Sequence, residues 1–147
     1  MKKIIAVDPG VGGGFCIGEF GILLPMPETL VEIADLMMEH KESNTELWLE
    51  EIPKFTGKNR NESTTAVLFQ NFGRVEGIAV ALGMSIHRVT PKVWQSVLGI
   101  GIRGDMEYAA WKRKLKAKAC ELYPHQHITL KTADAILIWH YAKGGGR

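Results

Sequence analysis

Four acidic residues of this 147-residue chain stand where a charged side chain is costly. Asp8 follows the apolar run IIAV, Glu50 and Glu51 follow LWL, and Asp134 precedes AILIW. A buried carboxylate needs a cation or a hydrogen-bond network to compensate its charge. Carboxylates that meet at the ends of parallel strands, beside a packed helix, favour a magnesium site, because Mg²⁺ prefers oxygen ligands and keeps several waters. Two such ions about 3.5–4 Å apart would hold the attacking and leaving oxygens of a phosphodiester.

Each acid taken alone also has a structural explanation. Asp8 precedes a glycine-rich turn that it could brace, and Asp134 stands near the start of a helix that it could cap. It is the combination of these acids with a basic second part of the chain that favours chemistry on a polyanion.

The elements that must position these acids follow from the apolar pattern. Short apolar runs predict strands at 2–8, 15–20, 21–25, 45–53 and 84–89. Helical spacing predicts helices at 27–41, 63–82, 90–99, from about 105 to 122, and 131–146. This order predicts one α/β domain over 1–147, with a five-stranded mixed sheet of three antiparallel and then two parallel strands, flanked by helices.

Two of the predicted helices carry a marked apolar stripe, and Trp94 and Trp111 are expected in the core. The long helix also carries Gly73, Gly77 and Ala81 at a spacing of four, which predicts close packing against the sheet or against a second subunit. The stripes are Leu68, Phe72, Val75, Ala79 and Leu82 on the long helix, and Tyr108, Trp111, Leu115, Ala119 and Leu122 on the helix from 105.

Charge is distributed unevenly along the chain. Residues 1–50 hold 3 basic and 9 acidic side chains, a balance of −6, whereas residues 51–147 hold 15 and 7, a balance of +8. The asymmetry predicts a polyanion against the second part, although a solvated lysine-rich face would give the same count. Cys16 and Cys120 lack metal-site spacing, and no run of 18 apolar residues occurs, so we expect a soluble cytoplasmic protein without zinc or a membrane span.

Four segments occur in an order that resembles a known family. They are IIAVDPGVGGGFCI, LWLEEIP, FGRVEGIAVALG followed by VTPKVWQSVLG, and TADAILIWHYA. Together they resemble the RuvC-like Holliday junction resolvases of the ribonuclease H-like superfamily, most nearly the small phage and mobile-element branch. The resemblance spans Ile4 to Ala142. The first segment is also typical of actin-like ATPases, but the chain is too short for their two lobes.

This resemblance implies a ribonuclease H-like fold and a crossover junction endodeoxyribonuclease. Its members are homodimers that hydrolyse phosphodiesters of branched DNA by a two-metal mechanism with magnesium, for which manganese substitutes. It places the protein in the cytoplasm of a bacterial or phage-infected cell, at the nucleoid. Two alternatives stay open: a less selective nuclease acting on flaps or RNA–DNA hybrids, and a catalytically idle junction-binding protein.

Carried over by position, the resemblance makes Asp8, Glu50 and Asp134 the metal ligands and catalytic acids. Glu51 then points to the other face of its strand. Family members carry Asp or His three residues before the last aspartate, where this chain has Lys131. Because a lysine ammonium offers no acceptor, Lys131 cannot bind magnesium. Three hypotheses follow: Lys131 contacts the scissile phosphate as a catalytic cation, which we favour; His125 or His127 replaces the ligand; or the second metal site is weakened.

The resemblance also assigns the loop after the second acidic strand to DNA binding. In the family this loop enters the junction, and Phe55 between Lys54, Lys58 and Arg60 suits a base-stacking wedge surrounded by phosphate contacts. The alternative is a surface loop with Phe55 folded into the core. The remaining predicted DNA contacts are Arg74, Lys92, Lys112 and Lys116, the last two on the lysine-rich face 112–118.

Overall fold

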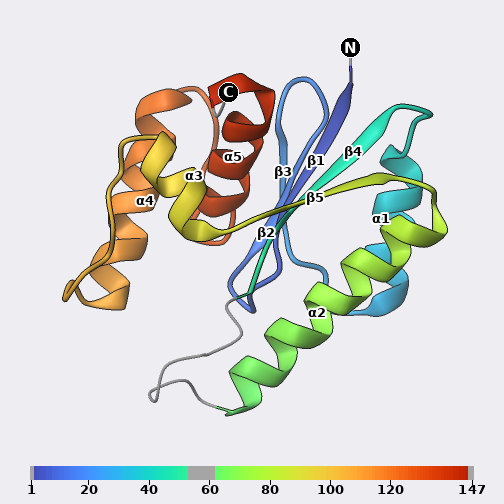
Figure 1. Ribbon diagram of the computed structural model, residues 1–147, viewed down its shortest axis with the longest axis horizontal. Helices are drawn as coiled ribbons and strands as arrows, with labels where there is room; N and C mark the ends of the chain where they lie inside the picture. Colours follow the sequence, from blue (N-terminus) through green and yellow to red (C-terminus); the bar gives the residue numbers. More distant parts are fainter. Residues whose placement is uncertain (1, 53–61, 146–147) are drawn as a thin grey trace.

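The computed structural model describes residues 2–52 and 62–145, and its five strands form one mixed sheet (Figure 1). The strand order is β3-β2-β1-β4-β5. β1 pairs antiparallel with β2, and β2 antiparallel with β3, whereas β1 pairs parallel with β4 and β4 with β5. The predicted sheet of antiparallel and then parallel strands is therefore confirmed. The strands are β1 Lys3–Asp8, β2 Gly14–Ile17, β3 Ile22–Pro25, β4 Thr45–Glu50 and β5 Ser85–Val89.

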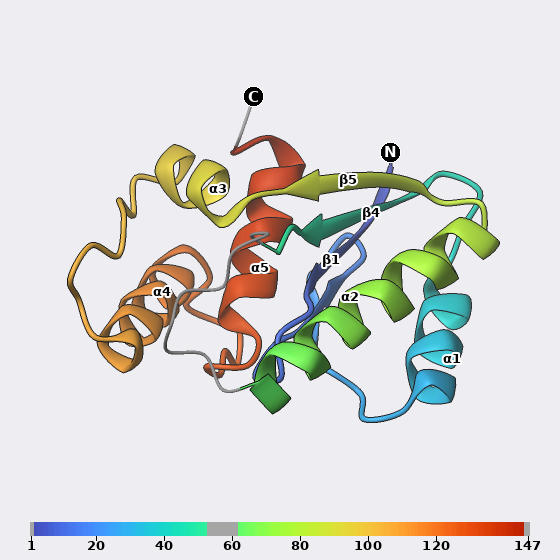
Figure 2. The ribbon, with the colours of Figure 1, turned by 60° about the horizontal axis from the view of Figure 1, so that its bottom comes forward.

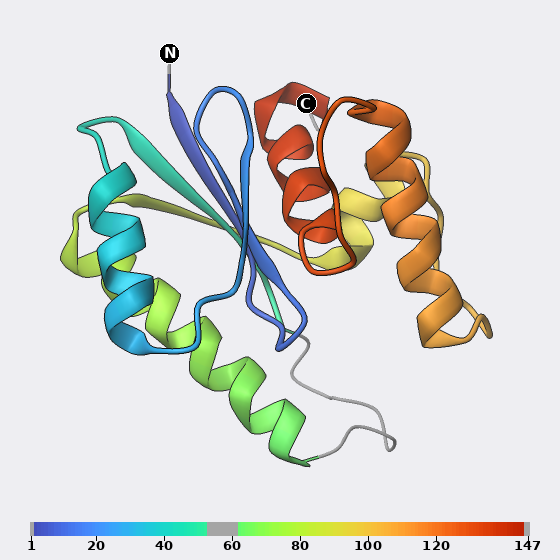
Figure 3. The same ribbon diagram turned by 180° about the vertical axis from the view of Figure 1, so that it is seen from behind.

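Helices cover both faces of this sheet. α1 and α2 lie on one face, and α5 packs on the other against β1 and β2, with α3 and α4 beside it (Figures 1 and 3). The helices are α1 Leu30–His40, α2 Glu62–Ala81, α3 Pro91–Val97, α4 Tyr108–Leu122 and α5 Ala133–His140, which continues into a π-helical turn Tyr141–Gly145. No helix within the described ranges has the length and apolar character needed to cross a membrane.

Alternation along the strands decides which side chains face α5. Ile4 and Ala6 of β1 belong to the core on the α5 side, whereas Ile5 and Val7 belong to the core under α1 and α2. Because side chains alternate with a period of two, Asp8 follows Ile4 and Ala6 onto the α5 side. On β4 the same rule places Glu46, Trp48 and Glu50 together on that side, with Leu47 and Leu49 opposite.

Most of the predicted apolar stripes pack into the core. Val75 and Ala79 of α2 are fully buried, as are Trp94 and the middle of the α4 stripe, while the ends of both stripes are partly exposed. Tyr108 differs most, being 60% exposed. Tyr108 is the first residue of the predicted stripe, and it is exposed because α4 begins at Tyr108 rather than near residue 105, which leaves Tyr108 at the exposed end of the helix.

Two predicted boundaries, the end of β2 and the start of α4, shift where glycines turn the chain. β2 ends at Ile17 rather than at residue 20, because Gly18 and Gly21 adopt φ values of +79° and +71° in the connection to β3. The segment before α4 holds Gly101 and Gly104, also at positive φ, which delays the helix.

Candidate active site

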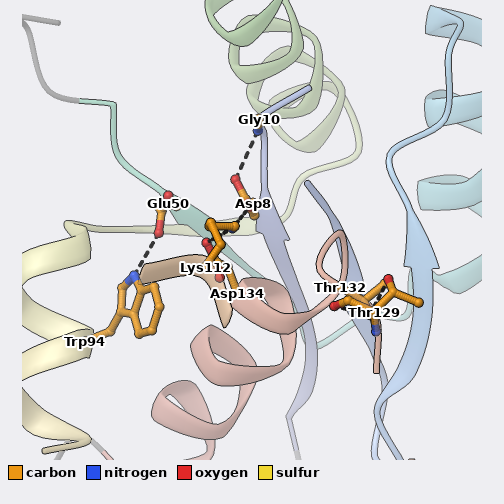
Figure 4. A network of polar contacts seen from close by, with 8 residues as sticks. All are labelled: Asp8, Gly10, Glu50, Trp94, Lys112, Thr129, Thr132 and Asp134. Atoms are coloured by element: carbon orange, nitrogen blue, oxygen red, sulfur yellow. Dashed lines mark hydrogen bonds and ion pairs between the residues drawn. The ribbon is translucent and has the colours of Figure 1, made fainter. Parts of the chain in front are cut away.

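The carboxyl ends of two neighbouring parallel strands bring two of the acids to one edge of the sheet. Asp8 is the last residue of β1 and Glu50 the last of β4, and the strands pair through Val7 and Leu49. Asp134 is the second residue of α5, which packs against β1. Figure 2 shows β4 and β5 running towards the side on which α5 and α3 lie, and Figure 4 shows the three acids near one another.

Asp8 is held by the glycine turn that follows it. Its side chain is buried, and Oδ1 accepts a hydrogen bond from the backbone N–H of Gly10 at 3.0 Å. A Cβ added to Gly13 would lie 2.1 Å from the Asp8 carbonyl oxygen and 2.9 Å from its Cγ. Only glycine fits this approach, so Asp8 braces the turn as well as belonging to the acidic cluster.

Asp134 is buried, and only one of its two carboxylate oxygens has a hydrogen-bond partner among the described residues. Oδ2 accepts a hydrogen bond from Lys112 Nζ at 2.6 Å, whereas Oδ1 has no hydrogen-bond partner in the described part of the chain. Burial, and next the charge of Asp8, raise the pKa of Asp134 to about 6, against the lowering effect of Lys112. Asp134 Oδ1, to which no described residue donates a hydrogen bond, is therefore available as a ligand for a cation.

Glu50 shares the environment of the other two acids. Burial first, then the charges of Asp8 and Asp134, raise the pKa of Glu50 well above its usual value. The indole Nε1 of Trp94 donates a hydrogen bond to Glu50 Oε2 at 2.8 Å and opposes this shift (Figure 4). Glu51 makes a different contact, its backbone N–H donating to the Val89 carbonyl at 2.8 Å.

Trp94 is a site residue that the sequence analysis assigned to the core alone. It is fully buried, as predicted, but its N–H also fixes one oxygen of Glu50. The available signal was chemical: a buried tryptophan needs an acceptor for its N–H. The sequence alone offered no means of choosing Glu50 among the acceptors.

Lys112 lies inside the acidic cluster rather than on an outer DNA-facing surface. Its Nζ is 2.6 Å from Asp134 Oδ2 and 4.0 Å from Asp8 Oδ2, and its side chain is 14% exposed. The two carboxylates favour its ammonium strongly enough to raise the pKa of Lys112 even though burial opposes this. The spacing of the lysines on this helix did not distinguish Lys112 from its neighbours.

The carboxylate oxygens of Asp8 and Asp134 suit a hard divalent cation, but the arrangement of the site suits it only in part. Asp8 and Asp134 direct carboxylate oxygens at one cationic group, and Asp134 Oδ1 is buried without a partner. Carboxylate oxygens are the ligands that Mg²⁺ prefers. Within the described ranges, however, no three acidic, histidine or cysteine side chains are arranged closely enough to hold a metal ion. Asp134 is bonded to Lys112 instead, and Glu50 Oε2 accepts the hydrogen bond from Trp94.

Lys131 lies at the same end of the sheet as Asp8. A Cβ on Gly14 would be 2.9 Å from the Lys131 carbonyl oxygen, and Gly14 pairs with Asp8 across β1 and β2. The Lys131 residue is exposed, three residues before Asp134. This placement is compatible with a phosphate contact at the mouth of the acidic cluster.

His125 and His127 flank Gln126, which is bonded at the other end of the sheet. The Gln126 side-chain amide donates to the Phe20 carbonyl at 3.0 Å, in the connection between β2 and β3. This connection lies at the opposite end of β2 from Gly14 and Asp8. The structure thus gives neither histidine a contact with the acidic cluster.

The other predicted DNA contacts fall in three places. Lys54, Phe55, Lys58 and Arg60 lie outside the described residues. Lys92 is exposed in the first turn of α3, and Lys116 is half-buried on α4, on the side of the sheet that carries α5. Arg74 is half-buried on α2, across the sheet.

Comparison with known proteins establishes the fold. No protein-family model and no curated protein matches the chain. Among solved structures it is similar to RuvC of T. thermophilus in complex with a Holliday junction substrate, with a TM-score of 0.62 and 14% identity over 100% of this chain and 99% of that one. A second Thermus thermophilus RuvC structure gives 0.60 and 14%, over 98% and 97%. The chain therefore has a RuvC-like, ribonuclease H-like fold, and these two structures support the fold without supporting the narrower phage and mobile-element branch.

Proposed function

We propose that the protein is a metal-dependent cytoplasmic endonuclease that cuts branched DNA at crossover junctions. The observation that carries this proposal is the meeting of Asp8, Glu50 and Asp134 at the carboxyl ends of β1 and β4 and the start of α5. The fold adds support, since it is shared with a RuvC that was solved with a Holliday junction substrate.

In this proposal the three acids hold a divalent ion, magnesium or manganese. A bound ion would supply an activated water and would neutralise charge that develops on the phosphodiester. Asp8 keeps one oxygen on the Gly10 N–H, which orients the other towards Asp134 and Lys112. Trp94 fixes Oε2 of Glu50 and leaves Oε1 for the ion. Burial and the charges of Asp8 and Asp134 raise the pKa of Glu50, and the positive charge of a bound ion would oppose that shift.

The cationic residues around the acids would hold the DNA backbone. Lys131 is exposed at the end of the sheet that holds Asp8, and α3 and α4, which carry Lys92 and Lys116, lie on the same side of the sheet as α5 (Figure 3). We assign Phe55 and the basic residues around it, which lie outside the described residues, to the junction itself. Junction affinity should fall steeply as the salt concentration rises, because each phosphate contact releases counterions. Replacing Lys58 and Arg60 together should weaken binding without moving the cut.

A second subunit would pack against the outer face of α2. A Cβ on Gly73 or Gly77 meets no atom within 4 Å, so these glycines do not serve close packing on the sheet. Phe69 and Val80, at nearby helical positions, are 46% and 65% exposed. Of the two packing partners that the glycine spacing allowed, a second subunit fits this open apolar face. Gly77→Gln should convert a dimer to a monomer in light scattering.

One assay tests the activity. A labelled four-way junction is incubated with the protein in magnesium and in EDTA, alongside a linear duplex, a flap and an RNA–DNA hybrid. Cleavage of the junction alone, in magnesium alone, is the expected result. Equal cleavage of the flap or hybrid would favour the less selective nuclease. Binding without any cleavage would favour the catalytically idle junction-binding protein. Two observations support that alternative: Lys131 occupies the family's ligand position, and Lys112 lies between two of the acids.

A further inference from the structure

The Lys112 side chain bridges two of the acids from the second turn of α4. Its ammonium donates a hydrogen bond to Asp134 Oδ2 at 2.6 Å and lies 4.0 Å from Asp8 Oδ2, an ion pair without a hydrogen bond, so both carboxylates face the same positive charge (Figure 4). Its exposed fraction, 14%, shows that the charge is largely withdrawn from water.

Other lysines of α4 have different surroundings. Lys114 lies over the Trp111 ring with Nζ 5.5 Å from the centroid, and Lys118 pairs with Glu121 at 3.1 Å on the surface. Packing of α4 on α5 through its buried stripe carries Lys112 to the start of α5, where Asp134 lies. The bridge is thus a product of helix packing and not of a general basic face.

We propose that Lys112 is the built-in counter-ion of the metal-free site, and that a divalent ion enters between Asp8 and Asp134 only by displacing the Lys112 ammonium. The inference rests on the proposed function, because it concerns the same site. Two buried carboxylates without a cation repel each other and favour opening of the site. The ammonium holds them together in the absence of metal, and it opposes metal binding by occupying the position and by adding a like charge beside it.

Metal affinity distinguishes this exchange from an ordinary structural ion pair. Isothermal titration with Mn²⁺ alone is carried out on the wild type, Lys112→Met and Lys112→Arg. Lys118→Met is the matched control, since it removes an ion-paired lysine of the same helix. We expect Lys112→Met to bind Mn²⁺ about tenfold or more tightly than the wild type, because the competing charge is gone. Lys112→Arg, which keeps the charge, and Lys118→Met should stay within about twofold of the wild type.

Metal-free stability gives a second readout. In EDTA, Lys112→Met should melt at a lower temperature than the wild type, and Mn²⁺ should raise its melting temperature more than that of the wild type. If Lys112→Met does not fold in EDTA, Lys112→Gln, which retains a hydrogen-bond donor to Asp134, takes its place in the titration with the same expected tightening. Equal or weaker Mn²⁺ binding by the neutral variants would overturn the exchange while leaving the metal site in place. Absence of Mn²⁺ binding by every form, wild type included, would overturn the proposed function with it.

Discussion

Two glutamates on β4 lie four residues apart on the same face of the sheet, and their surroundings give them opposite properties. Glu46 Oε2 accepts a hydrogen bond from the Trp48 indole at 3.3 Å, and Glu50 Oε2 accepts one from the Trp94 indole at 2.8 Å. Burial opposes ionisation of Glu46, but hydrogen bonds from Lys2 and Trp48 outweigh it, and the pKa of Glu46 is lowered. The pKa of Glu50 is raised well above its usual value.

The difference lies in which charges surround each carboxylate. Glu46 has an ion pair with Lys2, and His87 Nε2 lies 3.5 Å away. Glu50 has the charges of Asp8 and Asp134 beside it, with Lys112 bonded to Asp134. A tryptophan N–H donor is common to both glutamates, so this feature does not identify a functional acid. What identifies a functional acid is a cluster in which acidic side chains outnumber cationic ones, because such a cluster still requires a cation.

The largest expected effect is on catalysis. Glu50→Gln should lower the rate of junction cleavage by about a thousandfold or more, a loss of about 4 kcal/mol, since an amide cannot replace a charged ligand at the reacting centre. Junction binding should be kept or strengthened, because less negative charge faces the phosphates. Asp8→Asn and Asp134→Asn should behave alike. Single-turnover cleavage and gel-shift assays measure the two quantities.

The matched control for this loss is Glu46→Gln, which should keep turnover within about threefold because Glu46 lies at the other end of β4. A Glu51→Gln variant that loses cleavage while Glu50→Gln keeps it would contradict the placement of Glu50 in the site.

The loss of stability on substitution should be larger for Glu46 than for Glu50, the reverse of the order expected for catalysis. In EDTA at pH 7, Glu46→Gln should lower the free energy of unfolding by about 1–2 kcal/mol, since it loses charge-assisted hydrogen bonds from Lys2 and Trp48. Glu50→Gln should leave the free energy unchanged or raise it, because one of three neighbouring carboxylates is removed. Urea denaturation followed by tryptophan fluorescence measures both. A larger loss for Glu50→Gln than for Glu46→Gln would reverse the comparison.

Opposite pKa shifts should give opposite pH dependence. The folded pKa of Asp134, about 6, exceeds its unfolded value near 3.8, so the folded state binds the proton more tightly. Its contribution to metal-free stability is present below about pH 4 and is lost as pH rises through 6, with a slope of at most about 1.4 kcal/mol per pH unit. Asp134→Asn should remove this slope between pH 4 and 7.

The lowered pKa of Glu46 acts in the other direction, because its stabilising contribution is present above pH 4.5 and is lost as pH falls through the folded value. Glu46→Gln should therefore flatten the acid side of the stability profile. Equal profiles for Asp134→Asn and the wild type in EDTA would contradict the shift assigned to Asp134.

The smallest effect concerns the two exposed lysines at the ends of the sheet. Lys131→Ala should slow junction cleavage by about tenfold without altering Mn²⁺ affinity, because an exposed cation at the mouth of the site acts on phosphate through screened charge. Lys2→Ala should lower the free energy of unfolding and leave the cleavage rate unchanged, since Lys2 donates a hydrogen bond to Glu46 at the other end of β4. A normal cleavage rate for Lys131→Ala would remove the phosphate-contact hypothesis, and Lys131→Asp would then test whether a carboxylate there improves metal binding.

Much of the fold and part of the site could be predicted from sequence. Continuous apolar runs ending in an acid located β1 and β4, and period-two alternation put Asp8 and Glu50 on the same side as α5. Apolar spacing located the strands and helices, although the end of β2 shifted at Gly18 and the start of α4 shifted after Gly104. These properties are local, because a few neighbouring side chains and backbone angles decide them.

The residue order by itself therefore determined the elements, their sequence and the three acids at their ends. Tertiary structure decided the environment of those acids. Lys112 reaches Asp134 across 22 residues, and Trp94 reaches Glu50 across 44, contacts that exist because helices pack on a shared sheet. Local spacing places Glu50 at the end of its strand but does not predict its raised pKa, since the ionisation of such a group depends on charges brought near it by packing from distant parts of the chain.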